Sequence, residues 1–395
     1  MEFAWTGVGP APGTYLASMG ATVIRIESGT RPDPLRTMGP FKDGVRGLNR
    51  SAFYNAANTN KLGFALNMKH PKALDIARKL IAWADVLSEA YTPGTMKKWC
   101  LDYEEVKKIN PEIIYYSTSM AGQDGPYSAL PGFGAQLTGM TGFTLVTGWP
   151  DRLPAIPYGA YTDFINIKLA IFVLLAAIDY KRRTGKGHRI DLAQYEGGIL
   201  FLAPLMLDYF VNGKVAQRKG NRDPGFAPHG VYRCAGDDQW CALAVASDGQ
   251  WHSFCGVIGN PEWSAQPKFK TLPGRIADQD ELDMNIEQWT KNHSATEVMK
   301  RMQAAGIAAG VVNKASDTFT DPQLTERQAY RKVIHPEMGE HFAFNITAGS
   351  HFSKIQSEVR RPSPCIGEHN DFVCTQLLGM TADEVQACKN EGVFE

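Results

Sequence analysis

The first 27 residues contain the pattern that most restricts the fold of this chain. A short apolar strand at residues 3–5 runs into a turn rich in glycine and proline, and the helix that follows ends near Gly20. A second strand, rich in β-branched residues, covers 21–27. A strand, a helix and a strand in this order place the two strands parallel in one sheet. The chain is therefore expected to begin with a parallel α/β unit.

The alternation of helices and strands continues along the next 180 residues or so. Periodicity predicts helices over 72–86, 103–109, 164–183 and 195–210, and strands over 113–117 and 190–192. Helices that alternate with strands are typical of an α/β sheet covered by helices. We therefore expect the α/β class for this part of the chain.

The chain has 395 residues, more than the roughly 250–300 that a single core usually serves, so two domains are expected. Residues 212–228 are rich in Gly, Arg, Asn and Pro and are interpreted as a linker. The predicted parts are a large domain over 1–211, a small domain over 229–330 and a segment over 331–395 that returns to the large domain. The small domain is expected to hold a β-unit at 232–245 and a helix at 297–304. The return is expected to cross near 336–339 and to end in a helix at 368–391.

The charge balance narrows the range of partners. Lys plus Arg number 41 and Asp plus Glu number 41, so the formal net charge is zero. A neutral chain has no overall attraction to nucleic acid or to an anionic membrane, and neither is expected as a partner. Weak surface charge also favours self-association. Any anionic ligand must therefore be held by local cations.

Cysteine usage and hydropathy favour a cytoplasmic protein. The seven cysteines include no C-x-x-C pair, so reduced, mostly packed thiols are expected. No signal-peptide pattern opens the chain. The most apolar run, 164–178, carries Asn166 and Lys168 and is shorter than the ~20 residues that span a bilayer. We interpret it as a core helix.

Several motifs that would define other enzymes are missing from the sequence. It contains no G-x-x-x-x-G-K-[ST] phosphate loop, no G-x-S-x-G elbow and no histidine pair with metal-ligand spacing, so no metal site is predicted. Gly7, Gly9 and Gly13 lie between a strand and a helix, as in dinucleotide-binding proteins. The third glycine is one place late and two prolines occupy the turn, so a tight turn that needs glycine is the preferred interpretation.

Asp163 is the carboxylate that stands out. It directly precedes the long apolar helix. An acidic residue there is the ordinary capping arrangement of a helix. The same position also suits a nucleophile, because the helix dipole and free backbone N–H groups favour the ionised form. The pattern alone leaves both interpretations open.

Segments spread over almost the whole chain resemble one known family. The stretch from Ala84 to Gly94 (A-D-V-L-S-E-A-Y-T-P-G) resembles a characteristic A-D-V-x-x-E-N-F-x-P-G motif, and T-G-K-G at 184–187 followed by Asp191 resembles T-G-x-G-x-x-x-D. The N-T-N-K segment at 58–61 and the tail at 364–369 match in the same order. By these motifs the chain resembles the class III CoA-transferases of the CaiB/BaiF type, which include formyl-CoA, carnitine and benzylsuccinate CoA-transferases.

The resemblance implies a fold, a nucleophile and a coenzyme site. The implied subunit is ring-shaped, with a large Rossmann-like domain and a small α+β domain, and interlocks with a second ring as a homodimer or with a similar subunit. Asp163 falls on the catalytic aspartate. The implied CoA-binding residues are Arg36, Leu66, Lys69, Ala90, Tyr91 and Lys98. The CoA thioester would be a substrate, with no tightly bound cofactor.

The implied reaction moves CoA between carboxylic acids through an aspartyl mixed anhydride and an aspartyl-CoA thioester. Residues 147–152 are similar to the benzylsuccinate branch, so succinyl-CoA as donor and an aromatic dicarboxylic acid as acceptor are expected. Gly7 replaces a glutamine of formyl-CoA transferase, which disfavours oxalate and formate. Ala90 and Gly134 also depart from the family, which has asparagine at the first position and often an acidic residue at the second.

Two alternatives stay open. An α-methylacyl-CoA racemase needs a second proton-transfer group, and racemases carry a histidine-aspartate pair in the segment that is Phe133-Gly134 in this chain. The other alternative is a scaffold subunit that pairs with a similar catalytic chain. Loss of deuterium from a substrate α-carbon would identify the racemase, and an assay of the chain alone would identify the scaffold.

Overall fold

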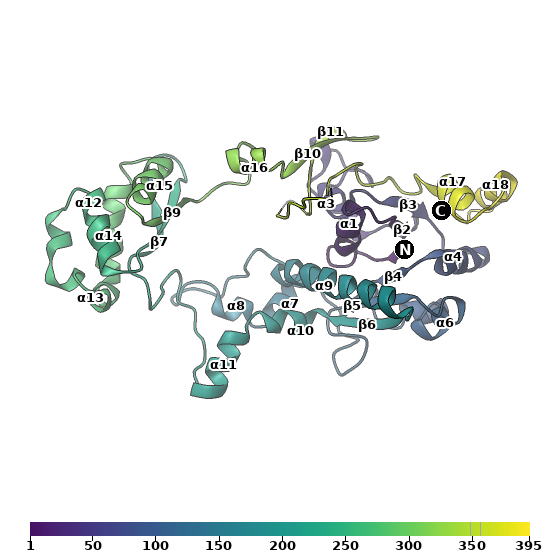
Figure 1. Cartoon of the computed structure of the whole chain (residues 1–395), viewed down its shortest axis with the longest axis horizontal. Coiled ribbons are helices and arrows are strands. Elements are labelled where there is room, and N and C mark those ends of the chain that lie inside the picture. The colour runs from purple at the N-terminus through teal and green to yellow at the C-terminus, as the bar shows by residue number, and fades with distance from the viewer. Residues whose placement is uncertain (348, 356) are drawn as a thin grey trace. The chain divides into compact units, whose positions relative to one another are not determined.

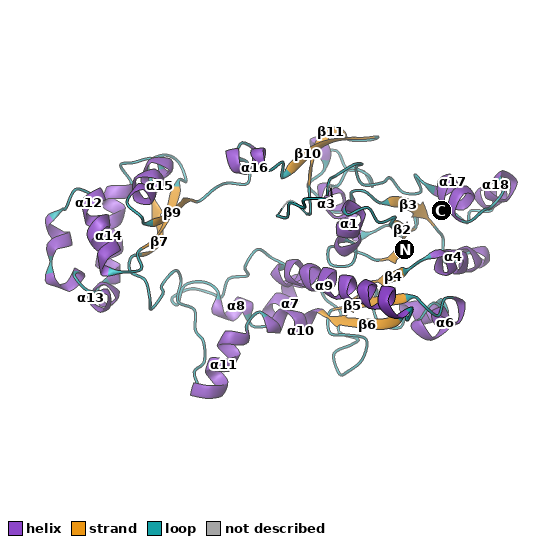
Figure 2. Cartoon of the chain, in the orientation of Figure 1, coloured by secondary structure: helices purple, strands orange, loops and turns teal. Residues whose placement is uncertain are grey.

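The structure is a computed structural model that describes residues 1–347, 349–355 and 357–395. By its internal contacts the chain forms two compact units. The larger unit comprises Met1–Thr144, Ile156–Val215 and Pro322–Glu395, and the smaller one comprises Leu145–Ala155 and Ala216–Asp321. Both units mix helices with strands, as Figure 2 shows.

A six-stranded sheet organises the larger unit (Figure 1). Its strands are β1 (Glu2–Phe3), β2 (Ile24–Glu27), β3 (Leu62–Ala65), β4 (Val86–Glu89), β5 (Ile114–Ser119) and β6 (His188–Ala193). They lie in the order β3-β2-β1-β4-β5-β6, and every neighbouring pair is parallel. This is the strand order of a Rossmann fold, so the predicted α/β class is confirmed.

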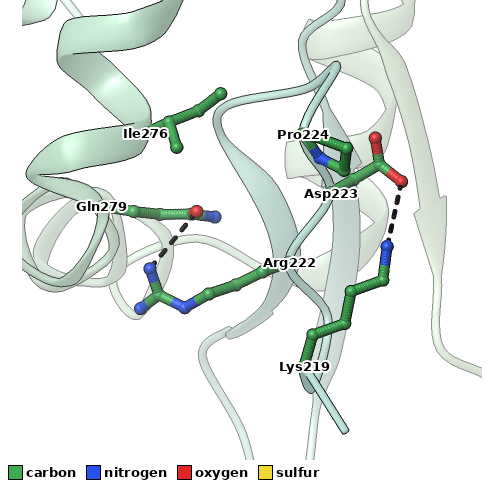
Figure 3. A pocket seen from close by; sticks show the side chains of 6 residues that line it. All are labelled: Lys219, Arg222, Asp223, Pro224, Ile276 and Gln279. Carbon is green, nitrogen blue, oxygen red and sulfur yellow. Dashed lines mark hydrogen bonds and ion pairs between the residues drawn. The ribbon is translucent and has the colours of Figure 1, made fainter. Parts of the chain in front are cut away.

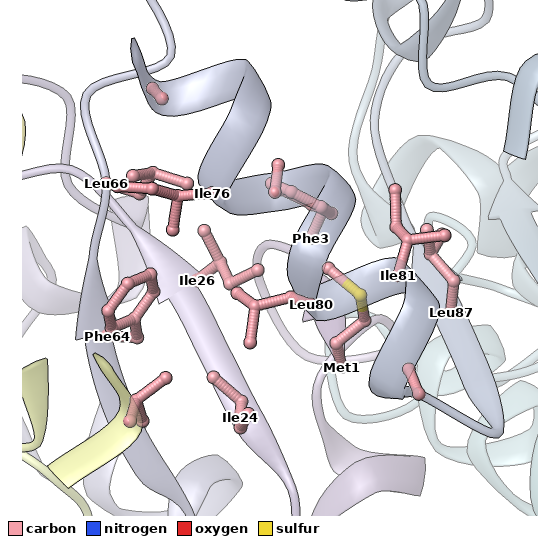
Figure 4. Close-up of a cluster of buried hydrophobic side chains, with 14 of the residues drawn as sticks. Met1, Phe3, Ile24, Ile26, Phe64, Leu66, Ile76, Leu80, Ile81 and Leu87 are labelled. Atoms are coloured by element: carbon pink, nitrogen blue, oxygen red, sulfur yellow. The ribbon is translucent and has the colours of Figure 1, made fainter. Parts of the chain in front are cut away.

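Helices cover both faces of this sheet. Ile76 and Leu80 of α4 (Pro71–Trp83) pack among sheet residues such as Ile26 (Figure 4). Tyr115 belongs to the same cluster, whereas its neighbour Ile114 packs with residues of α9 (Tyr161–Thr184). Successive strand residues point to opposite faces, so α4 and α9 lie on opposite sides of the sheet.

The packing of α9 also explains its apolar composition. With 24 residues α9 is longer than the predicted apolar run, and by length and composition alone it could cross a membrane. The prediction that this segment is too short to span a bilayer was therefore wrong. Ala170, Leu174 and Ala177 pack against Ile114 and Tyr116 of β5, as expected for a helix in the core of a sheet protein.

Several predicted elements needed correction. The helix predicted over 72–86 ends at Trp83, and β4 begins three residues later. The helix over 195–210 is two helices, α10 (Gln194–Leu200) and α11 (Ala203–Asn212), because Pro204 at the start of α11 cannot continue a helix. Residues 336–338 join the antiparallel strands β10 (Tyr330–His335) and β11 (Gly339–Phe344), so the predicted crossing is a hairpin turn.

The smaller unit has its own sheet and core. Its strands β7 (His229–Arg233), β8 (Trp240–Ala244) and β9 (Ala308–Val311) are antiparallel, in the order β7-β8-β9. Its main helices are α12 (Asp248–Val257), α13 (Leu272–Ala277), α14 (Gln279–Thr290) and α15 (Ala295–Ala304). Their buried side chains form a separate apolar cluster around Phe254 and Ile286. The three helices α12, α13 and α14 were not predicted.

Residues of the expected large domain also contribute to the smaller unit. The Arg218 guanidinium donates to the carbonyl oxygens of Leu145 (3.2 Å) and Trp149 (3.4 Å), and Gly220 N donates to Gly148 O (2.9 Å). A Cβ at Gly220 would lie 2.4 Å from the Trp149 ring. These contacts attach Leu145–Ala155 to the smaller unit.

Candidate active site

Asp163 lies in the first turn of α9, at the carboxyl edge of the large sheet. Because α9 leads directly into the parallel strand β6, it runs against the strand direction, and its first turn lies where the strands end. In open α/β sheets this edge is where ligands bind. The helix begins two residues before Asp163, slightly earlier than predicted.

The first turns of α9 are anchored by polar contacts on either side of Asp163. Thr162 N donates to Thr138 Oγ1 (3.4 Å), and Thr138 Oγ1 in turn donates to Gly134 O (2.7 Å). The buried Asn166 amide donates to Thr162 O (2.8 Å) and to Gln194 O at the start of α10 (3.0 Å). The backbone that carries Asp163 is therefore held by two neighbouring helices. Sequence reasoning did not identify these polar residues, because threonine and asparagine inside a helix carry no recognisable signal.

The carboxylate of Asp163 is half-buried and unpaired. No hydrogen bond or ion pair reaches it from the residues that the structure describes. Burial raises the pKa of Asp163 from 3.8 to about 6. At neutral pH the group is still mostly ionised, so it presents an anionic oxygen that no cation has neutralised.

Gly134 touches this carboxylate directly. Gly134 is the first residue of α7 (Gly134–Met140), and a Cβ built on it would lie 2.2 Å from Asp163 Oδ1 and 2.5 Å from Ala160 Cβ. Phe133 and Gly134 are the positions at which racemases carry histidine and aspartate. In this chain the space beside Asp163 is bounded by backbone at that point and offers no proton-transfer side chain.

The CoA residues implied by the resemblance follow the strands of the same sheet. Ala90 and Tyr91 come directly after β4, beside β1, where the strand order reverses. In Rossmann-type sheets ligands bind at this switch point. The loops after β1 and β4 touch there, because a Cβ on Gly9 would lie 2.6 Å from Ala90 Cβ. The glycine of the first turn thus serves close backbone packing.

Aromatic side chains pack at the end of β4, and two exposed lysines follow β3 and β4 in the chain. The Tyr91 ring lies edge-on to Trp5 (5.2 Å between ring centroids) and to Trp99 (5.5 Å). Lys98, at the end of α5 (Thr95–Lys98), is exposed, and so is Lys69 after β3. Neither ammonium group forms an ion pair within the described ranges, so both remain available to an anion. Leu66 is buried in the core beside β3.

Arg36 has a different environment from the two lysines. It is fully buried, and all five of its N–H groups are engaged. Nε and Nη2 donate to Glu27, Nη2 also donates to Pro364 O (3.1 Å), and Nη1 donates to Leu48 O (3.0 Å) and Asn49 Oδ1 (2.7 Å). A phosphate could bind Arg36 only if it replaced one of these acceptors. In this chain Arg36 organises the loop after β2.

Two pockets are lined by none of these residues. One, of about 310 Å³, opens after β5 and β6, but its charged residues are Asp124, Asp191 and Glu196, which would repel a phosphate or carboxylate. The other, of about 180 Å³, lies in the smaller unit, where Lys219 pairs with Asp223 and Arg222 donates to Gln279 (Figure 3). Among the described residues no group of three or more His, Cys, Asp or Glu is placed to hold a metal ion.

Fold and site together define a Rossmann-type α/β protein with an unpaired carboxylate at its ligand-binding edge. The sequence model of CoA-transferase family III matches residues 1–370, which is most of the chain. The chain therefore belongs to CoA-transferase family III and is a class III CoA-transferase.

Curated relatives and a solved structure agree with this assignment. The chain is 31% identical to a succinate–glutarate CoA-transferase of Agrobacterium fabrum (95% of this chain, 94% of the relative) and 30% identical to a succinyl-CoA–D-citramalate CoA-transferase of Chloroflexus aurantiacus (95% and 92%). It also matches the crystal structure of a CaiB/BaiF family protein from Brucella suis, with a TM-score of 0.86 and 30% identity over 95% of this chain and 97% of that one.

Proposed function

We propose that this enzyme transfers CoA from succinyl-CoA to a second carboxylic acid, with Asp163 as the nucleophile. The observation that carries the proposal is the unpaired Asp163 carboxylate in the first turn of α9. A carboxylate that no cation neutralises keeps its charge for attack, and its pKa of about 6 leaves it mostly ionised at neutral pH.

The proposed reaction runs through covalent intermediates on Asp163. One carboxylate oxygen attacks the thioester carbonyl, the carbon–sulfur bond breaks, and CoA leaves as a thiolate from a mixed anhydride. The thiolate then attacks the aspartyl carbonyl, which releases the donor acid and leaves an aspartyl-CoA thioester. The acceptor carboxylate repeats the two steps in reverse order and regenerates Asp163. Each step exchanges one acyl bond for another, so no external energy source is needed.

The coenzyme site we propose follows the residues that the family implies. Lys69 and Lys98 would meet CoA phosphates, since both are exposed and unpaired in the described chain. Tyr91, with Ala90 beside it, would pack near the adenine. Leu66 would act indirectly, because its buried side chain fixes the loop after β3 to the core. We assign Arg36 a supporting role, because its donors already hold the loop after β2.

The acids are inferred from relatives and from the surroundings of Asp163. The two relatives above are named for succinyl-CoA or succinate together with D-citramalate or glutarate, which are dicarboxylic acids. Exposed aromatic side chains precede Asp163 in the chain at Tyr158 and Tyr161, and Phe133 precedes Gly134, which contacts the carboxylate. They favour an acceptor with an apolar part. We therefore propose a dicarboxylic acceptor, with benzylsuccinate-like aromatic acids included.

A competition assay tests donor and acceptor together. The purified chain alone is given succinyl-CoA and an equimolar mixture of glutarate, citramalate, benzylsuccinate, oxalate and acetate, and the CoA products are identified by mass spectrometry. The proposal predicts CoA esters of dicarboxylic acids other than oxalate. Product from acetate alone would overturn the proposed acceptor class, and absence of transfer by the chain alone would support the scaffold alternative.

We also propose that two copies associate as ring-shaped, interlocked subunits. None of the ten residues of α11 is buried within the chain, although six of them are large and apolar, and Phe210 is 84% exposed. Apolar surface of this kind is typical of an interface between copies. Light scattering should give twice the mass of one chain, and Phe210→Asp should shift the mass toward that of one chain.

A further inference from the structure

We propose that Gly134 is the positioning residue for the Asp163 carboxylate: the absence of a side chain at 134 creates the space that the carboxylate occupies. The inference rests on the proposed role of Asp163 as nucleophile. It concerns a position at which the family often carries an acidic side chain and this chain carries none.

The contact is too close to admit any other residue without a shift. A Cβ on Gly134 would lie 2.2 Å from Oδ1 and 2.7 Å from Cγ of Asp163. Two groups in the vicinity can yield, and they differ in stiffness. The carboxylate can rotate about its side-chain bonds, whereas the Ala160 methyl group, 2.5 Å from the same Cβ, moves only with its backbone. The easiest response to a side chain at 134 is therefore that Asp163 swings away.

The surrounding helices are packed so closely that a side chain at 134 should displace the Asp163 carboxylate and not the helix backbones. Thr138 connects the first turn of α7 to Thr162 of α9, and a Cβ on Gly198 of α10 would lie 2.7 Å from Thr141 and 3.0 Å from Thr162. Helix backbones packed this closely have little freedom to separate. The Asp163 side chain is therefore the part of this contact that moves most easily.

The test compares two alanine variants in one helix. In Gly134→Ala the new methyl group meets Asp163, whereas in Gly139→Ala it meets only Thr144 Oγ1 at 3.9 Å, an ordinary contact. Displacement of a reacting group by about 1 Å costs on the order of 100-fold in rate. We expect Gly134→Ala to lower kcat by about that factor with an unchanged KM for succinyl-CoA, and Gly139→Ala to match the wild type. Equal kcat values for the two variants would overturn the proposal.

A pH profile separates displacement from partial unfolding. A carboxylate that swings toward water regains hydration, so the acid limb of kcat/KM should move from about pH 6 toward lower pH in Gly134→Ala. Unfolding would lower the amplitude and leave the limb in place, which would contradict the proposal.

The double variant Gly134→Ala/Ala160→Gly removes the other close contact. It should stay as impaired as Gly134→Ala, because the contact with Asp163 persists. Recovery to the level of Ala160→Gly alone would show that the loss came through Ala160 and would overturn the inference. If Asp163→Asn is inactive and Gly134→Ala is fully active, only this inference fails. An active Asp163→Asn enzyme would overturn the proposed nucleophile itself.

Discussion

Two carboxylates in the larger unit, the buried Glu27 and the half-buried Asp163, differ in whether other side chains compensate their charge. Burial alone would raise the pKa of Glu27, but hydrogen bonds from Arg36 and Tyr54 and the charge of Arg25 outweigh it and hold the pKa below its usual value. Burial raises the pKa of Asp163 to about 6, and no partner opposes it. Removal of one partner from a buried charge pair destabilises the fold, whereas a carboxylate that is shielded from water without partners lowers stability itself and stays reactive.

The largest expected effect is the loss of turnover when the unpaired carboxylate is removed. Asp163→Asn keeps the shape of the side chain but cannot form the anhydride, so kcat should fall by about 10⁴-fold or more. Because the variant also removes a buried charge, its melting temperature should equal or exceed that of the wild type. Asp179→Asn, on the exposed face of the same helix, is the control and should retain full activity. If Asp163→Asn is inactive only because it is unfolded, Asp163 is needed for stability as Glu27 is, and the two carboxylates do not differ in role.

Removal of the paired carboxylate should have its main effect on stability. Glu27→Ala leaves the buried Arg36 without its ion-pair partner, and an uncompensated buried charge typically costs about 3–5 kcal/mol. Urea unfolding followed by circular dichroism measures the loss. Asp43→Asn, which removes the charge of an exposed partner of Lys42 and Arg50 and keeps a residue type that tolerates the positive φ of 56° at this position, should leave the midpoint unchanged. A Glu27→Ala midpoint equal to that of the wild type would show that the buried cluster does not hold the fold.

The pH dependence of activity should report the same contrast. The reactive form of Asp163 is ionised, so activity is lost as pH falls through about 6, and kcat/KM at pH 5 should be about tenfold lower than at pH 7. Glu27, with its lowered pKa, stays ionised over that interval, and its contribution to stability is lost only at lower pH. Circular dichroism should therefore show an intact fold at pH 5. Activity that stays constant between pH 5 and 7 would contradict the raised pKa.

The smallest expected effect is on coenzyme affinity. Lys69→Met and Lys98→Met each remove one exposed cation, so KM for succinyl-CoA should rise about two- to fivefold, with kcat unchanged. The increase should shrink at high salt. Lys108→Met, whose ammonium group already pairs with Glu105, is the matched control. If all three variants had the same KM for succinyl-CoA as the wild type, neither Lys69 nor Lys98 would bind a CoA phosphate.

The sequence predicted that the sheet is parallel, but it did not predict all of its strands. The unit from residues 3–27 implied parallel strands, and β5 and β6 were expected within two residues of their observed bounds. Strands β3 and β4 were missed, because each has only four residues. β3 is buried at every position, so its sequence shows no alternation. β4 alternates in burial, but one of its two buried positions is Glu89, so its sequence does not show the pattern of a half-buried strand.

Prediction of the candidate site depended on two kinds of information, the sequence pattern and the family resemblance. The position of Asp163 before an apolar helix was visible in the pattern, but its interpretation as a nucleophile required the family resemblance. The contact between Gly134 and Asp163 joins residues 29 positions apart, and no periodicity encodes it. Likewise, Arg36 donates to Pro364 O, which is far away in the chain, and the sequence around Arg36 cannot reveal such a partner.

Trapping the covalent intermediate tests the central claim most directly. The enzyme is mixed with succinyl-CoA in the absence of an acceptor, quenched with acid and digested, and its peptides are analysed by mass spectrometry. We expect a hydroxylamine-sensitive CoA adduct on the peptide that contains Asp163 and none on the peptides with Glu27 or Asp191. An adduct on another residue, or full turnover with no adduct on Asp163 at any time, would contradict the account.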